Sequence, residues 1–97
     1  MSKKLFSVIL LLSLGFAAFA QNALKGVVKD ENGAPLEGVT VMIAGTTNGT
    51  ITDAEGKYSI SVPDGATVEY SCIGLESFSH KFKGEKVLDV VMKEDNL

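Results

Sequence analysis

The amino-acid sequence predicts an all-β protein in which two sheets pack face to face. Three observations indicate this class. Apolar and polar residues alternate along most of the chain, turn residues recur about every 8 to 12 positions, and no segment shows the apolar stripe of a helix. About seven short strands are expected. Because each is apolar on one face only, a second sheet must cover that face, and the result is a β-sandwich.

The first half of the domain contains two alternating segments and a turn-rich one. Residues 24–30 alternate and end at a cluster of turn formers, and residues 38–46 form the clearest strand. Residues 46–53 are rich in turn formers, with Asn48 and Gly49 at their centre.

The second half alternates in four further segments, at residues 57–63, 67–74, 76–83 and 87–94, of which 76–83 is the weakest. A bulge in the second of these would turn Ile73 inward in place of its neighbour. The side chains expected to face the core are Val39, Val41, Ile43, Tyr58, Ile60, Val62, Val68, Tyr70, Cys72, Phe78, Phe82, Leu88, Val90 and Met92.

The first twenty residues have the features of a secretory signal peptide. Lys3 and Lys4 precede an apolar run that ends near Leu14, and Ala18 and Ala20 give the small-x-small pattern that signal peptidase reads. The run is short and no basic stop-transfer cluster follows it, so a retained membrane helix is not expected. No Cys follows the run to carry a lipid anchor. The sequence thus predicts an exported chain with a cleaved signal at 1–20, one domain at 21–94 and an acidic tail at 95–97.

The part that follows the signal is acidic. It holds seven Lys, no Arg and all twelve Asp and Glu, so its net charge is −5. Arg is the side chain best suited to clamping phosphate, and nucleic acid is therefore not expected as a partner. The negative charge also disfavours anionic membrane surfaces, and no membrane insertion of the mature domain is expected. Cys72 is the only cysteine, so stability must come from burial, which supplies about 3–5 kcal/mol in a core of this size.

Two acidic clusters, DENG at 30–33 and DAEG at 53–56, share the spacing Asp-x-x-Gly. The Asp can accept a hydrogen bond from a backbone N–H two residues on, and the Gly can adopt a positive φ. Calcium loops need oxygen ligands at alternating positions and a distant Glu, which neither cluster has. We therefore interpret both as turns and expect no metal and no cofactor. The predicted turn residues are Asp30, Gly33, Pro35, Gly49, Asp53, Gly56, Pro63 and Gly65.

No catalytic constellation is expected. His80 is the only histidine, which rules out a zinc site of several His within one chain. A Cys72–His80 dyad can be drawn, but a thiol on a core face is inert. The serines alternate with apolar residues, which places Ser59, Ser61, Ser71, Ser77 and Ser79 on outer faces.

Two blocks of sequence follow a known pattern: GVVKDENGAPLEGVTV at 26–41 and GTTNGTITDAEGKYSI at 45–60, followed by a Pro-x-Gly turn and Ile73-Gly74. In this order they resemble the carboxypeptidase-regulatory-like domain at the N-terminus of SusC-type TonB-dependent outer-membrane receptors of Bacteroidota. The resemblance covers about Leu24 to Glu94. It departs from the family pattern at Leu75, where an aromatic residue is usual.

The resemblance implies a transthyretin-like, seven-stranded Greek-key sandwich without catalytic residues, located in the periplasm next to the outer membrane. The implied partners are the plug and barrel of a receptor or the energy-coupling proteins. Family members usually continue into a TonB box after an acidic stretch like the one at the end of this chain. Both a truncated receptor and a free-standing module fit the sequence.

Three function hypotheses follow. The first is a non-catalytic domain of nutrient import, in which an edge strand could pair with a partner. The second is a separate binding or adhesion module, which would gain support if Phe78 or Phe82 were exposed on one flat face. The third is an enzyme like the hydroxyisourate hydrolases, which share transthyretin topology. Their sites need several His and an Arg, whereas this chain has one His and no Arg.

Overall fold

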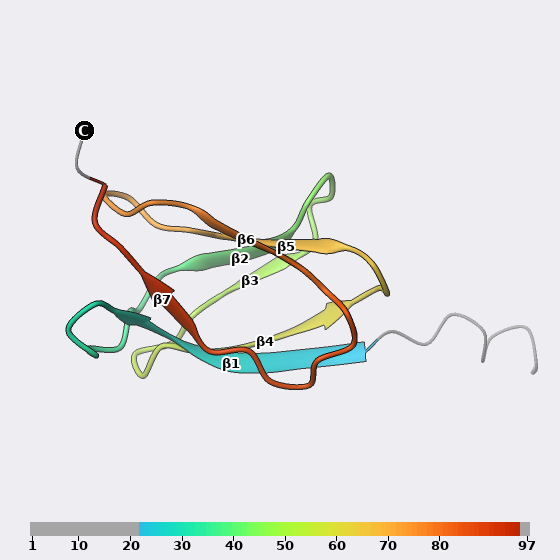
Figure 1. The fold of residues 1–97 in the computed structure, drawn as a ribbon, viewed down its shortest axis with the longest axis horizontal. Helices are drawn as coiled ribbons and strands as arrows, with labels where there is room; N and C mark the ends of the chain where they lie inside the picture. The colour runs from blue at the N-terminus through green and yellow to red at the C-terminus, as the bar shows by residue number, and fades with distance from the viewer. Residues whose placement is uncertain (1–21, 96–97) are drawn as a thin grey trace, which may run out of the picture.

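The computed structural model describes residues 22–95, which form seven strands and no helix (Figure 1). Within these residues no helix is long and apolar enough to cross a membrane. The expected signal peptide at 1–20 and the end of the tail lie outside the described residues. The strands are β1 (Asn22–Asp30), β2 (Thr40–Ile43), β3 (Gly49–Ile51), β4 (Lys57–Val62), β5 (Thr67–Ser71), β6 (Phe78–Lys81) and β7 (Val90–Met92).

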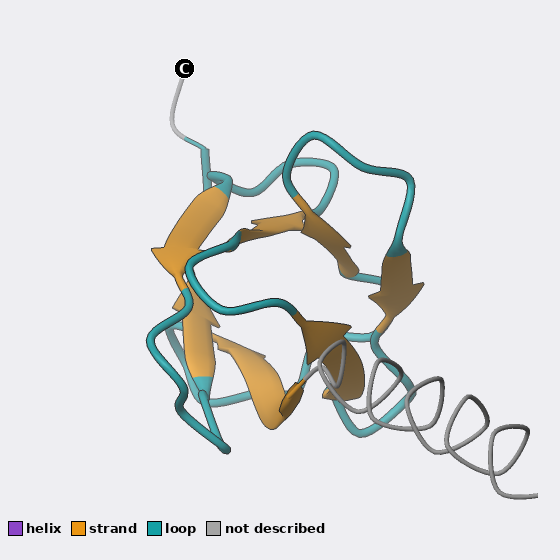
Figure 2. Cartoon of the chain, turned by 90° about the vertical axis from the view of Figure 1, so that its right-hand side faces the viewer, coloured by secondary structure: helices purple, strands orange, loops and turns teal. Residues whose placement is uncertain are grey.

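The strands form two layers. One sheet has the order β4-β1-β7 and the other the order β3-β2-β5-β6. In Figure 1, β1 and β4 lie in the lower layer and β2, β5 and β6 in the upper layer, and Figure 2 views the layers from one end. All neighbouring strands are antiparallel except β1 and β7, which are parallel. The last strand returns to the side of the first, as Greek-key connections do. The predicted all-β, seven-stranded sandwich is confirmed.

The core lies between the two layers and follows the alternation of the sequence. In β4 every second residue is buried, and the residues between them face solvent. The five serines expected on outer faces are all exposed. The buried apolar side chains are Leu24, Val28, Val39, Val41, Ile43, Tyr58, Ile60, Val62, Val68, Tyr70, Phe82, Val90 and Met92.

Residues 46–53 differ from the expectation, because they contain a strand. Gly49 was predicted as a turn residue, but it opens β3 and pairs with Met42 of β2. The turn lies earlier, where Gly45 has a φ of 76°. The β-branched Thr50 and Ile51 favour an extended backbone, and this preference outweighs the turn tendency of the Asn-Gly pair before them.

Four core predictions also need correction. Ile73 is fully exposed, so the alternative with a bulge is wrong. Cys72 and Leu88 are half-buried and pack against the edge of the core. Phe78 keeps 38% of its surface exposed because it lies on the edge strand β6, where its ring packs against only one core aromatic, Tyr70.

The two Asp-x-x-Gly clusters form the same turn. In the first, Asp30 Oδ1 accepts hydrogen bonds from the N–H groups of Asn32 and Ala34, both at 2.9 Å. Gly33 donates its N–H to the Asp30 carbonyl at 3.0 Å and has a φ of 83°. This is a three-residue hairpin loop closed by a glycine bulge.

The second cluster repeats each of these contacts. Asp53 Oδ1 accepts from the N–H groups of Glu55 and Lys57 at 2.9 Å, and Gly56 donates to the Asp53 carbonyl at 2.9 Å with a φ of 77°. The remaining turn, Pro63 to Ala66, places Gly65 at a φ of 79°. Pro35 follows the first turn and forms a bridge with Lys29.

The two turn glycines predict different costs for the same substitution. Gly33→Ala should destabilise the domain by about 1 kcal/mol, because a side chain there has open space and meets only the penalty of a positive φ. Gly56→Ala should cost about 3 kcal/mol, because its Cβ would also lie 2.5 Å from the Val28 carbonyl oxygen. Urea unfolding of both variants measures the difference. Equal losses would show that the contact with Val28 does not matter.

Candidate functional site

The acidic clusters have their carboxylates directed at their own turns. Asp30 and Asp53 each use one oxygen to hold two backbone N–H groups. Among residues 22–95 no group of three or more His, Cys, Asp or Glu side chains could hold a metal ion. The geometry of both clusters is that of a turn.

His80 and Cys72 belong to different contacts. His80 Nε2 pairs with Glu85 Oε2, and the other carboxylate oxygen of Glu85 accepts the Lys83 N–H at 2.6 Å. These contacts hold the connection between β6 and β7 against the inner side of β6. The contact with His80, and after it the backbone N–H bonds, keeps the pKa of Glu85 below its ordinary value. Cys72 instead packs against the core edge.

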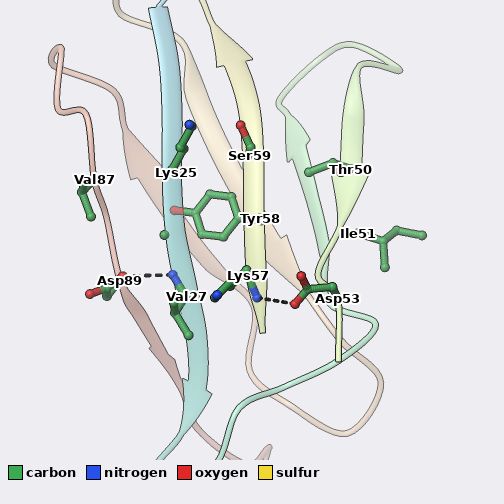
Figure 3. Close-up of a pocket in the computed structure, with 11 residues that line it drawn as sticks. Lys25, Val27, Thr50, Ile51, Asp53, Lys57, Tyr58, Ser59, Val87 and Asp89 are labelled. Carbon is green, nitrogen blue, oxygen red and sulfur yellow. Dashed lines mark hydrogen bonds between the residues drawn. The ribbon is translucent and has the colours of Figure 1, made fainter. Parts of the chain in front are cut away.

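An open groove of about 630 Å³ lies on the outer side of the three-stranded sheet. Figure 3 shows its lining: side chains of β1 and β4 in the middle, the segment before β7 on one side and β3 on the other. The described lining residues are Lys25, Gly26, Val27, Thr50, Ile51, Asp53, Lys57, Tyr58, Ser59, Val87 and Asp89.

Gly26 belongs to the lining of the groove, and the segment before β7 runs alongside β1 at this point. A Cβ on Gly26 would lie 1.8 Å from the Leu88 carbonyl oxygen, so only glycine permits this close approach. Leu88 donates its N–H to the Lys25 carbonyl at 2.8 Å, and Asp89 Oδ1 accepts the Val27 N–H at 2.9 Å. The backbone carbonyl of Leu88 therefore points inward, beneath the groove.

Two buried tyrosines form a hydrogen-bonded chain that ends at the Leu88 carbonyl. Tyr58 donates its hydroxyl hydrogen to the Leu88 carbonyl at 2.6 Å, and its oxygen lies 2.7 Å from the hydroxyl of Tyr70, which donates to it. The two rings pack edge to face, with centroids 5.4 Å apart. Burial, and then the contact with Tyr70, raises the pKa of Tyr58 far above its ordinary value. Burial likewise raises the pKa of Tyr70. Both phenols stay protonated and act as fixed donors.

The lysines at the groove are its accessible charged donors. Lys57 pairs with Glu55 at 2.8 Å, which raises its pKa, whereas Lys25 takes part in neither of the two ion pairs formed within residues 22–95. Both carboxylates of the lining, Asp53 and Asp89, accept backbone N–H groups. This arrangement suits the binding of a partner surface, since its charged groups are exposed and its phenols are used within the core.

Sequence reasoning missed the close approach of Leu88 to Gly26 and a second buried connection at Thr52. Thr52 Oγ1 accepts the Val39 N–H at 2.9 Å and donates to the Leu36 carbonyl at 2.7 Å. A glycine in the middle of a strand is a signal for close backbone approach, so Gly26 could have been found. The role of Thr52 depends on a contact 16 residues away, for which the sequence holds no local sign.

Residues 24–97 match the family of the CarboxypepD_reg-like domain. The chain belongs to this family. Its curated relatives include TonB-dependent receptor P39 of Formosa agariphila, 40% identical over 78% of this chain, and TonB-dependent receptor SusC of Bacteroides thetaiotaomicron, 36% identical over 94% of it. TonB-dependent receptor P3 of Formosa agariphila is 32% identical over 94% of this chain. The chain spans only 7 to 9% of the length of these relatives. The family resemblance seen in the sequence is confirmed.

Solved structures share the fold at low sequence identity. Two chains from type II cohesin–X-dockerin complexes of Acetivibrio cellulolyticus superpose with TM-scores of 0.61 and 0.59, at 23% and 24% identity. The matches cover 75% and 73% of this chain, and 58% and 56% of the two cohesin–X-dockerin chains. At this identity the likeness describes the fold alone.

The tyrosine pair predicts unequal effects of removing either hydroxyl. Tyr58→Phe should cost about 2 kcal/mol, because it leaves the Leu88 carbonyl without this donor. Tyr70→Phe should cost about 1 kcal/mol, because Tyr58 still donates to Leu88. Urea unfolding checks the order of the two losses. A larger loss for Tyr70→Phe would contradict the assigned direction of donation.

The Glu85 contact predicts a component of acid sensitivity. A lowered folded-state pKa stabilises the domain above the ordinary value of 4.5, and this stability is lost as the pH falls through the folded-state pKa. Glu85→Gln should therefore lower the melting temperature near neutral pH and flatten its fall between about pH 5 and pH 3. Glu69→Gln, on the exposed face of β5, is the control. An unchanged acid limb in Glu85→Gln would refute the contribution.

Proposed function

We propose that this chain is a non-catalytic, exported domain that serves TonB-dependent nutrient import from the periplasmic side of the outer membrane. It acts there through contact with the plug and barrel of a receptor or with energy-coupling proteins. The observation that carries the proposal is its similarity to three TonB-dependent receptors at 32 to 40% identity over most of this chain. The expected signal peptide at residues 1–20 supports export.

The side-chain geometry supports a role in binding. The groups that could transfer protons are engaged in structure: Tyr58 with a backbone carbonyl, His80 with Glu85, and Asp53 with its own turn. A general base needs an available lone pair of its own and must lie within reach of the substrate proton. The groove offers exposed lysine and aliphatic side chains instead.

No observation on the described residues favours the adhesion hypothesis. Glycan-binding modules use exposed aromatic platforms, but Tyr58, Tyr70 and Phe82 are buried. Phe78 is partly exposed and packs against Tyr70, so the described residues form no flat aromatic face.

A receptor chimera tests the proposal. The matching segment of SusC from Bacteroides thetaiotaomicron is replaced by residues 22–95 of this chain, and a second strain lacks the segment. Uptake of the receptor's own substrate should be restored in the chimera to within about twofold of the parent and should be lower in the deletion. A third strain carries an unrelated β-sandwich of equal length.

Immunoblots of outer-membrane fractions verify that the strains contain equal amounts of receptor. If the chimera transports no better than the deletion or the unrelated sandwich, the proposed role is wrong.

A further inference from the structure

The outer face of the three-stranded sheet carries a regular pattern of charged and aliphatic side chains. Along β1, Leu24 and Val28 point into the core, so Lys25, Val27 and Lys29 share the opposite face. Residues at i and i+4 of a strand lie about 13 Å apart on one face. The lysines therefore flank a central valine along the strand.

The neighbouring strands extend this pattern sideways. Val87 forms an isolated parallel bridge with Lys25, and Val91 pairs with Lys29 in the ladder between β1 and β7. On the other side Lys57 pairs with Val27. Val87 and Val91 are 65% and 58% exposed, although both are aliphatic. We call these six residues, Lys25, Val27, Lys29, Lys57, Val87 and Val91, the lysine–valine face.

The charge of this face is opposite to that of the chain, whose formal net charge is −3. Lys25 and Lys29 take part in neither ion pair of the described residues. Asp89, the acid between the two valines, directs one oxygen to the Val27 N–H. The lysine–valine face therefore leaves two positive charges without a carboxylate partner on an otherwise acidic domain.

We propose that the lysine–valine face docks an extended segment of a partner protein that has an aliphatic residue between two carboxylates at alternate positions, in the order acid-x-aliphatic-x-acid. An extended segment repeats on one face every two residues, so its acids would meet Lys25 and Lys29 while its aliphatic residue covers Val27. Val87 and Val91 would bury the flank of the segment. This inference rests on the proposed function, for which it names the kind of partner.

The charge of the lysine–valine face disfavours a second copy of this chain as its occupant. Two lysine–valine faces brought together would place the lysines of one copy against those of the other, and like charges in direct opposition are destabilising. An anionic lipid surface could satisfy the lysines but offers no geometric match to the spacing along β1. It is therefore an outcome that the experiment distinguishes.

Amide chemical shifts of the chain without its first 20 residues test the proposal, since both sheets and the described core lie within residues 22–95. The probes are the peptide Ser-Glu-Thr-Val-Thr-Glu-Ser, the same peptide with Lys in place of Glu, and vesicles that contain phosphatidylglycerol. The Glu peptide should give saturable shifts at residues 25–29, 57 and 87–91, and the Lys peptide none.

Matched variants locate the contact. Lys25→Glu with Lys29→Glu should weaken binding of the Glu peptide about tenfold, because two ion pairs are lost. Val87→Ser with Val91→Ser should weaken it at least about threefold through lost apolar contact. Lys81→Glu on β6 and Ile73→Ser, both on the side of the other sheet, should bind as the parent does.

Several results would overturn the proposal: no saturable shift with the Glu peptide, equal binding of the Lys peptide, shifts centred on the four-stranded sheet, or vesicles that shift these residues when the Glu peptide does not. The titration needs no receptor, and the chimera needs no peptide. Failure of this inference is therefore distinct from failure of the proposed function.

Discussion

The hydrogen bond from Tyr58 to the Leu88 carbonyl is the contact on which the rest of the structure depends. Tyr58 belongs to the three-stranded sheet and Tyr70 to the four-stranded sheet, while Leu88 lies on the connection that leads into β7. One pair of phenols therefore joins both layers and the returning chain. An unpaired carbonyl at this depth would cost about 1–3 kcal/mol, which is a large share of the stability of a small domain. With one cysteine the chain has no internal disulfide to supply that link.

The same contact explains why β1 contains a glycine. The Leu88 carbonyl oxygen that accepts from Tyr58 lies where a Cβ at residue 26 would be. Asp89 then satisfies the Val27 N–H that the interrupted ladder leaves open. A close backbone approach, a missing side chain and an aspartate thus form one unit where the segment before β7 meets β1.

Most reactive side-chain types of this domain are used to hold backbone in place. Asp30 and Asp53 organise their turns, Glu85 holds the β6–β7 connection through His80, and Thr52 joins two loops. What remains accessible is a surface. Four of the seven lysines from residue 21 onward lie on β1, on β4 or in the segment before β7: Lys25, Lys29, Lys57 and Lys86. This use of its side chains agrees with the proposed role in binding, and the chain is related to parts of much longer receptors.

The sequence by itself determined the fold class, most of the core and the two matching turns. These depend on local physics: alternation with period two selects the buried face of each strand, and Asp-x-x-Gly contains both the acceptor and the residue able to adopt a positive φ. Only the tertiary structure decided that Gly49 begins a strand, that Ile73 is exposed and that Tyr58 meets a carbonyl 30 residues away. The lysine–valine face was also beyond sequence reasoning, because Val87 and Val91 come next to Lys25 and Lys29 through parallel pairing of β1 with a segment more than 60 residues along the chain. Such pairing is set by which strands can bury their apolar faces together, and no local pattern of residues records it.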